Sequence, residues 1–214
     1  RLVRGNFKEI GKLARDNGFV DVDGVLFDLG LSSWQLEQGG RGFSFQKDEL
    51  LDMRQDPTLA VTAADLINGL YENELAELFF RFGEEPRARG FARAINRRRE
   101  LKPIRTTKEL ADLLVAASGL KYWRRHPATQ VFQALRIAVN NELVNLEAAL
   151  PQALELLRVN GSLAVISFHS LEDRIVKRFF KMSLSPRPSV RNSFRLLTPR
   201  PLVPEATELH DNPR

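Results

Sequence analysis

The stretch Asp23-Gly24-Val25-Leu26-Phe27-Asp28 decides the fold, because it reads as a short buried β-strand that ends on a carboxylate. A helix is predicted just before it, over residues 8–17, and Leu29-Gly30 follows it directly. A short apolar run bounded by a helix stop and a glycine is typical of a central parallel strand. The sequence therefore predicts an α/β sheet with Asp28 at the carboxyl end of one strand.

A second strand is predicted over residues 162–167, after a turn at Asn160-Gly161. His169 follows this strand, and a helix is predicted to start there and to run to Phe180. The order of strand, helices, strand and helix is the pattern of an open α/β sheet, in which ligands bind beyond the carboxyl ends of the strands. Asp28 and His169 occupy those ends, so we expect both to belong to a ligand site.

The region between the two strands is predicted to be all-helical from about residue 37 to 125. Thr62 is expected to cap the first of its helices, and Pro151 is expected to kink a long last helix or to start a new one. The tail from residue 183 onward is rich in proline and is expected to consist mainly of loops. The predicted helices span residues 63–69, 72–82, 87–99, 107–117 and 128–150.

Basic residues are concentrated in two segments. Residues 81–105 hold nine Arg or Lys against three Glu, and residues 171–200 hold eight against two acids, in a chain of net charge +5. In the helix over residues 87–99 the apolar side chains share one face, while Arg89, Arg93 and Arg97 fall on the opposite one. Such segments indicate a surface that faces a polyanion, although a solvated face with no ligand is the alternative.

Composition excludes several classes of protein. The 214 residues include no cysteine, which rules out disulfides and cysteine-ligated metals, and the three histidines lack metal-ligand spacing, so no metal is expected. The apolar runs are too short to span a bilayer, and no secretory leader is evident. We therefore expect a cytoplasmic protein.

The residues after each strand have two interpretations. Gly30 lets a ligand approach the backbone beside Asp28, but an acid and serines there can also simply cap the next helix. After the second strand, Ser170 and Asp173 can form an ordinary capping box, which leaves Phe168-His169 unexplained. A serine hydrolase is excluded, because no Gly-x-Ser-x-Gly elbow occurs.

Several motifs together resemble the RsmH (MraW) family of small-subunit ribosomal RNA cytosine-N4 methyltransferases. They occur in the family order and cover most of the chain: residues 23–30 (DGVLFDLG), 41–45 (RGFSF), 51–54 (LDMR), 82–85 (FGEE), 126–129 (HPAT), 132–140 (FQALRIAVN) and 167–174 (SFHSLEDR). The resemblance implies a Rossmann-like methyltransferase domain, residues 1–36 and 126–214, that is interrupted by an all-helical insertion, residues 37–125. It also implies that the family's glycine-rich cofactor loop, and the acid that holds the ribose, lie before Arg1.

The resemblance further implies the chemistry of the site. The methyl donor is S-adenosylmethionine, which Phe7, Asp28 and Gln35 are expected to contact, and the substrate is a cytidine near the decoding centre of the small subunit. Candidate catalytic residues are Asp28, Ser32, Ser33 and His169, with His169 either accepting a proton or stacking on the base. Phe43 or Phe45 is a further candidate for stacking. The candidates for contact with RNA are Arg89, Arg93, Arg97, His126, Arg136 and Arg174.

Two other functions remain open from the sequence. One is a non-catalytic basic module that binds ribosomal RNA during assembly, which would bind RNA without depending on S-adenosylmethionine. The other is a different nucleotide-binding α/β enzyme, which would need a glycine loop for phosphate that is not seen in this chain.

Overall fold

The structure is a computed structural model that describes residues 1–32, 39–183 and 194–211. Its described part holds two strands, β1 (Val22–Asp28) and β2 (Leu157–Ile166), in one parallel sheet. The helices are η1 (Phe7–Glu9), α1 (Ile10–Asp16), α3 (Ala63–Gly69), α4 (Glu72–Gly83), α5 (Ala88–Leu101), α6 (Thr107–Ser118), α7 (Ala128–Asn140), α8 (Glu142–Leu156), α9 (Ser170–Ser183) and α10 (Ala206–Asp211). Within the described ranges, no helix is both long and apolar enough to cross a membrane.

The two strands run side by side to a common carboxyl edge. Asp28 pairs with Ile166 in the register, and the next backbone N–H, that of Leu29, donates to the Ile166 carbonyl at 3.2 Å. The predicted turn at Asn160-Gly161 is wrong: both residues lie inside β2, where Asn160 has a φ of 67° and the register with β1 shifts between Val22 and Gly24. The physical reason is that the register shift between the two strands places Asn160 in the left-handed conformation, which is also the conformation of an Asn-Gly turn.

Only one face of this sheet is packed. Phe27 and Leu29 are buried with residues of α8 and α9 in one hydrophobic cluster. On the opposite face Leu26 is 64% exposed and Ile166 is 45% exposed. The expectation of a buried strand is therefore confirmed for the inner face and wrong for the outer one, where the described chain places nothing over the sheet.

The helices between the strands form a second hydrophobic cluster, built on Phe79, Phe91, Ile95, Leu110 and Leu135 among others. Two of these helices begin with complete capping boxes, Thr62 with Asp65 and Thr106 with Glu109, in which each side chain accepts from the other residue's backbone N–H. The helices expected at residues 63–69, 72–82, 87–99 and 107–117 are all confirmed to within two residues at each end.

The single long helix expected over residues 128–150 is wrong. The structure divides it into α7 and α8 at Asn141, whose φ of 52° lies in the left-handed region that helices do not use. The apolar pattern continues through the break, because α7 packs in the helical cluster while α8 packs under the sheet. Pro151 lies inside α8 and starts no new helix.

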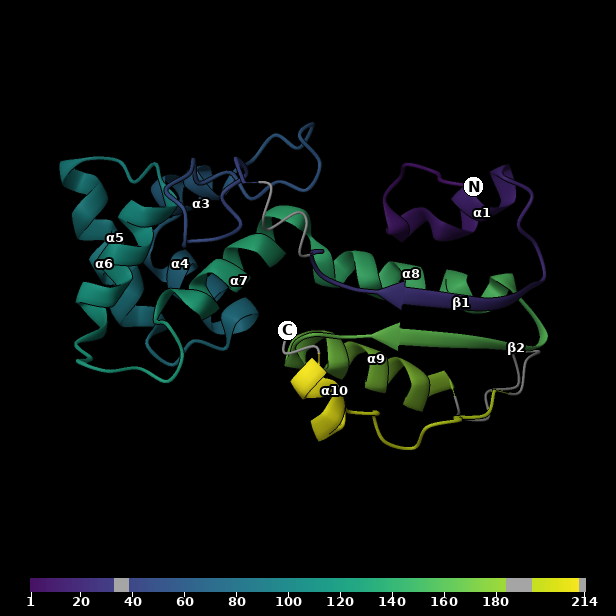
Figure 1. Ribbon diagram of the computed structural model, residues 1–214. Helices are drawn as coiled ribbons and strands as arrows, with labels where there is room; N and C mark the ends of the chain where they lie inside the picture. The colour runs from purple at the N-terminus through teal and green to yellow at the C-terminus, as the bar shows by residue number, and fades with distance from the viewer. Residues whose placement is uncertain (33–38, 184–193, 212–214) are drawn as a thin grey trace.

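The arrangement of the two groups is visible in Figure 1. The arrowheads of β1 and β2 point toward the group formed by α3 to α7, and α8 leads from that group back along the sheet. The carboxyl edge of the sheet, with Asp28 and the residues after Ile166, therefore faces the helical group. This is the edge at which α/β proteins bind their ligands.

Candidate functional site

The carboxyl edge of the sheet presents an acid, a glycine and an aromatic ring. The Asp28 side chain is exposed at the end of β1. Gly30 has a φ of 88°, and a Cβ built on it would lie 3.5 Å from Cδ2 of Phe168 on the neighbouring chain segment. One residue before Asp28, Phe27 packs edge-on against Phe7, with ring centroids 6.0 Å apart. Two of the predicted site residues, Phe7 and Asp28, thus lie at the same end of the strand.

Beyond β2 the side chains continue to alternate between outside and inside. Phe168 points outward and is 68% exposed, whereas the His169 side chain is only 11% exposed. The Nδ1 atom of His169 accepts a long hydrogen bond of 3.4 Å from the backbone N–H of Glu172. Its buried Nε2 atom lies 3.2 Å from Glu172 Oε1 but is not aligned with that oxygen for a hydrogen bond. Both ring nitrogens of His169 are therefore turned toward Glu172.

Glu172 is a buried carboxylate with several partners. Its Oε2 atom accepts a hydrogen bond of 2.9 Å from the backbone N–H of Phe168. Burial alone raises the pKa of Glu172, but the contacts with His169 and with the Phe168 N–H outweigh it, and the net effect lowers the pKa below its ordinary value. The turn after β2 is therefore held by an ionised carboxylate.

A second carboxylate, Glu142, lies beside this pair, and its side chain is only 11% exposed. Arg136 donates to both of its oxygens, at 2.8 and 2.9 Å, while burial raises the pKa of the Glu142 carboxyl. Ligand atoms of Glu142, His169 and Glu172 all lie within 4.8 Å of one another, which is close enough for a cation. Since the guanidinium of Arg136 already occupies both Glu142 oxygens, we interpret the cluster as an ion-pair network between α7, α8 and α9.

Glu84 joins the helical group to the start of α9. It ends α4 in the left-handed conformation, with a φ of 51°, and accepts hydrogen bonds from the Ser170 hydroxyl and, at 2.7 Å, from Arg174. These bonds, that of Ser170 first, lower the pKa of Glu84. Arg174, a predicted RNA contact, is engaged in this ion pair.

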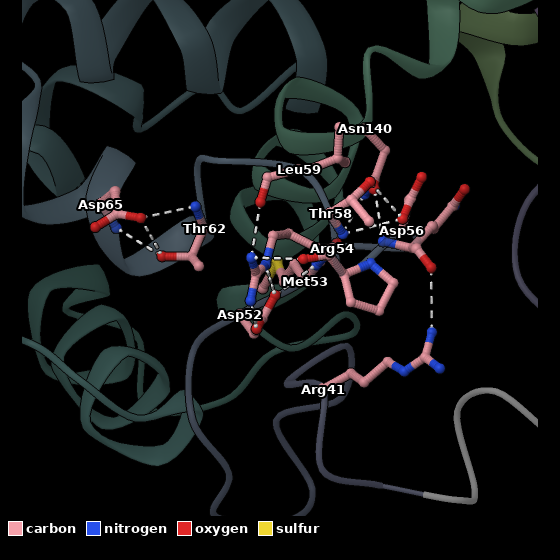
Figure 2. Close-up of polar contacts among 12 residues, drawn as sticks. Arg41, Asp52, Met53, Arg54, Asp56, Thr58, Leu59, Thr62, Asp65 and Asn140 are labelled. Atoms are coloured by element: carbon pink, nitrogen blue, oxygen red, sulfur yellow. Dashed lines mark hydrogen bonds and ion pairs between the residues drawn. The ribbon is translucent and has the colours of Figure 1, made fainter. Parts of the chain in front are cut away.

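The motif at residues 51–54 forms an internal polar network rather than an open site (Figure 2). Arg54 pairs with both carboxylate oxygens of Asp52, at 2.7 and 2.8 Å, which lowers the pKa of Asp52. Asn140, at the end of α7, donates to the Met53 carbonyl at 2.7 Å and accepts from the backbone N–H of Gln55 at 2.7 Å. This network fixes the loop to the helix that carries Arg136.

The arginine face of α5 is open to solvent. Arg89, Arg93 and Arg97 are exposed, and Arg93 lies 3.8 Å from Glu72 in a partly exposed ion pair. Arg89 and Arg93 also line an open pocket between α4 and α5. The three side chains are therefore accessible at the surface, and their contact with RNA stays a prediction.

Four of the side chains predicted to contact RNA or a base make contacts inside the protein. Arg136 is bound to Glu142, as described above, and its side chain is only 20% exposed. His126 stacks on Phe45 with ring centroids 4.4 Å apart, and burial lowers its pKa. His126 therefore covers one face of the Phe45 ring, which also packs in a T-shaped arrangement against Phe132, and Phe43 is partly buried against the same helical cluster.

The structure brings Asp28 and the Phe168-His169 turn to one edge, with exposed Ser32 just beyond Gly30. The candidates Ser33 and Gln35 lie outside the described residues. Sequence reasoning missed Glu172 and Glu142 as neighbours of His169. The spacing of three residues between His169 and Glu172 was a usable signal for a helical contact, whereas nothing local pointed to Glu142.

Comparison with known proteins agrees with these motifs. The model of the MraW methylase family matches residues 1–214. Proteins named ribosomal RNA small subunit methyltransferase H are similar over almost the whole chain: that of Thermomicrobium roseum is 53% identical over 98% of this chain and 68% of its own length. Those of Coprothermobacter proteolyticus and Syntrophobacter fumaroxidans are 46% and 47% identical, over the whole of this chain and 69% and 70% of theirs. The chain belongs to the MraW methylase family, a family of methyltransferases.

Proposed function

We propose that this protein transfers a methyl group from S-adenosylmethionine to the N4 amino group of a cytidine in small-subunit ribosomal RNA, near the decoding centre. The observation that carries the proposal is the match over the whole chain to relatives named as small-subunit RNA methyltransferases. The exposed Asp28 and Phe168 at the carboxyl edge of a parallel sheet support it, because that edge is the usual ligand site of the fold class. The cytoplasm, where such a substrate is met, is its proposed location.

We also propose that the sheet belongs to a Rossmann-like methyltransferase domain, and that residues 37–125 are a helical insertion in it. Two separate hydrophobic clusters support this division, one under the sheet and one among the helices. The helical cluster extends through α7, so the packing favours a return to the methyltransferase domain at Asn141.

The described residues fit S-adenosylmethionine as a ligand. Its ribose hydroxyls and its ammonium group are hydrogen-bond donors. An exposed carboxylate such as Asp28 can accept hydrogen bonds from them. Gly30, without a side chain, keeps the backbone beyond Asp28 accessible. Phe7 and Gln35 complete the proposed set of cofactor contacts. When bound, the donor supplies a methyl group on a sulfonium that needs no further activation.

The chain must hold a weak nucleophile in place, since the lone pair of the cytosine N4 atom is delocalised into the ring. The N4 atom gains the methyl group and loses one proton. Asp28 is the candidate acceptor for that proton, and the Leu29 carbonyl is a candidate acceptor for the remaining N4 hydrogen. Ser32 and Ser33 are proposed to hydrogen-bond the base. Because both nitrogens of His169 face Glu172, we assign His169 to positioning rather than to proton transfer.

The exposed arginines of α5 are proposed to bind phosphates of the RNA, whereas Arg136 and His126 would act through the internal contacts they already make. Arg174 is paired with Glu84 but is 56% exposed, so it stays a candidate for contact with RNA. A non-catalytic RNA-binding module is the second candidate function, supported by the two basic segments. This binding module would differ measurably from a methyltransferase, because it would bind small subunits without using the methyl donor.

The experiment is transfer of labelled methyl from S-adenosylmethionine to isolated small subunits by the full-length protein. We expect transfer by the wild type and a loss of at least about tenfold in Asp28→Asn, which keeps the shape but removes the charge. Asp23→Asn, at the other end of β1 and 82% exposed, is the matched control and should leave the rate unchanged. RNA binding with no transfer by the wild type would favour the second candidate.

A further inference from the structure

Phe168 is an exposed aromatic ring on a fixed backbone. Its side chain is 68% exposed, although it follows a strand whose inner face is packed. Its backbone N–H donates to Glu172 Oε2 at 2.9 Å, and the Glu172 side chain is only 4% exposed. The bond therefore holds the main chain at this residue while the ring remains open to solvent.

The residue after it reinforces this orientation. His169 turns inward and contacts the same carboxylate through its buried Nε2 atom, 3.2 Å from Oε1. The groups facing His169 are Glu172 from α9, Glu142 from α8 with its partner Arg136 from α7, and Glu84 at the end of α4 with its partner Arg174. Glu172 holds His169 inside, with Glu142 close by, and the alternation of side chains then keeps Phe168 outside.

The ring also lies at the same edge of the sheet as Asp28, the proposed acceptor of the N4 proton. Asp28 pairs with Ile166, two residues before Phe168, so the carboxylate and the ring share one edge of the sheet. Gly30, beside the ring, presents no side chain that would fill the space. A flat apolar surface next to a hydrogen-bond acceptor is the combination that recognises an unstacked base.

We propose that Phe168 stacks on the target pyrimidine, and that the buried His169–Glu172 pair is the positioning device that presents its ring. This inference rests on the proposed function and adds to it a residue that stacks on the face of the base. It also accounts for the Phe168-His169 dipeptide, whereas Ser170, expected as a possible helix cap, lies inside α9 and donates its hydroxyl to Glu84.

Stacking can be separated from simple apolar contact by a series of substitutions at one position. In the full-length protein, Phe168→Ala is expected to lower kcat/KM on small subunits by about 5- to 150-fold, the equivalent of about 1–3 kcal/mol for one stacked base. Phe168→Leu keeps apolar bulk without a π-face and should behave like Phe168→Ala, whereas Phe168→Trp should restore most of the activity. Binding of S-adenosylmethionine, measured by calorimetric titration, should be unchanged throughout. Phe19→Ala, at an exposed position between α1 and β1 (46% exposed), is the matched control and should be as active as the wild type.

The positioning role has its own test, because Glu172 acts through Phe168. Glu172→Ala should lower kcat/KM in the wild-type background and should not lower it further in a Phe168→Ala background. If Glu172 had a purely structural role, Glu172→Ala would lower kcat/KM by the same factor in both backgrounds. Glu172→Gln, which keeps an oxygen for the Phe168 N–H, should retain more activity than Glu172→Ala and gives the test if the alanine variant fails to fold.

The outcomes separate this inference from the proposed function. An inactive wild type contradicts the proposed function. An active wild type with full activity in Phe168→Ala, or with rescue by leucine as good as that by tryptophan, overturns the stacking role and leaves the proposed function standing.

Discussion

Gly42 is a residue at which the backbone leaves no room for a side chain. Its φ is 68°, and a Cβ there would lie 2.2 Å from the Leu50 carbonyl oxygen. We expect Gly42→Ala to lower the free energy of unfolding by roughly 1–3 kcal/mol, since both the strained conformation and the clash oppose it. Urea denaturation followed by circular dichroism measures the change.

Gly90 provides the matched control for that substitution. It lies inside α5, and a Cβ built on it meets no heavy atom within 4 Å. Gly90→Ala should therefore stabilise the protein, by about 0.5–1 kcal/mol, through helix propensity alone. If Gly42→Ala proved as stable as the wild type, the close approach of Gly42 to Leu50 would be contradicted.

The sequence is informative at the residue scale where the chemistry is local. The caps at Thr62 and Thr106 follow from a hydroxyl residue and an acid three positions later, and the position of Asp28 at a strand end follows from the apolar run before it. The neighbours of His169 follow only in part. Glu172 is one helical turn away, but Glu142 is brought in by the packing of α8 against α9, which no local pattern encodes.

At the scale of elements, Asn140 fixes the end of α7 to the loop that precedes α3. Its amide donates to the Met53 carbonyl and accepts from the Gln55 N–H, and the residue is 7% exposed. Asn140→Ala leaves these two backbone groups without their hydrogen-bond partner, so we expect a loss of about 1–3 kcal/mol in the free energy of unfolding. A thermal melt should show a fall of several degrees. Asn73→Ala, on the exposed face of α4, should leave the melting temperature within about a degree, and an equal effect of both substitutions would count against this anchor.

The sequence is enough to predict that these helices exist, but not where one helix ends and the next begins. Periodic apolar positions define α4, α5 and α6 to within two residues. The break at Asn141 escapes such reasoning, because the apolar stripe runs on while its two halves pack against different clusters. The sequence predicts a turn at Asn160 where the structure has an irregular strand, because an asparagine before a glycine has the same local preference in both settings.

At the scale of the whole molecule, the arginine face of α5 predicts how RNA binding depends on salt. Replacing Arg89, Arg93 and Arg97 together by Gln should weaken binding to small-subunit RNA and reduce the slope of log K against log salt by about 2–3, roughly one for each lost phosphate contact. Filter binding at several salt concentrations gives the slope. As a control, Lys8, Lys12 and Arg15, three exposed cations on η1 and α1, are replaced by Gln together, which should leave the slope nearly unchanged. If both triple variants changed the slope equally, RNA binding would depend on the total charge and not on the arginine face of α5.

The division into two packed groups was predictable from the order of the elements, but not the contacts between them. Glu84 and Arg174 are 90 residues apart in the chain, and their bond depends on where α4 ends and α9 begins. Family membership therefore supports the activity, while the structure identifies which side chains face the edge where it would take place.

The most direct measurement is nucleoside analysis of small-subunit RNA after methyl transfer by the full-length protein. We predict that the label appears in N4-methylcytidine, at one position near the decoding centre, and that the yield falls in Phe168→Ala. Label in any other nucleoside, or none in RNA despite binding of S-adenosylmethionine, would contradict it.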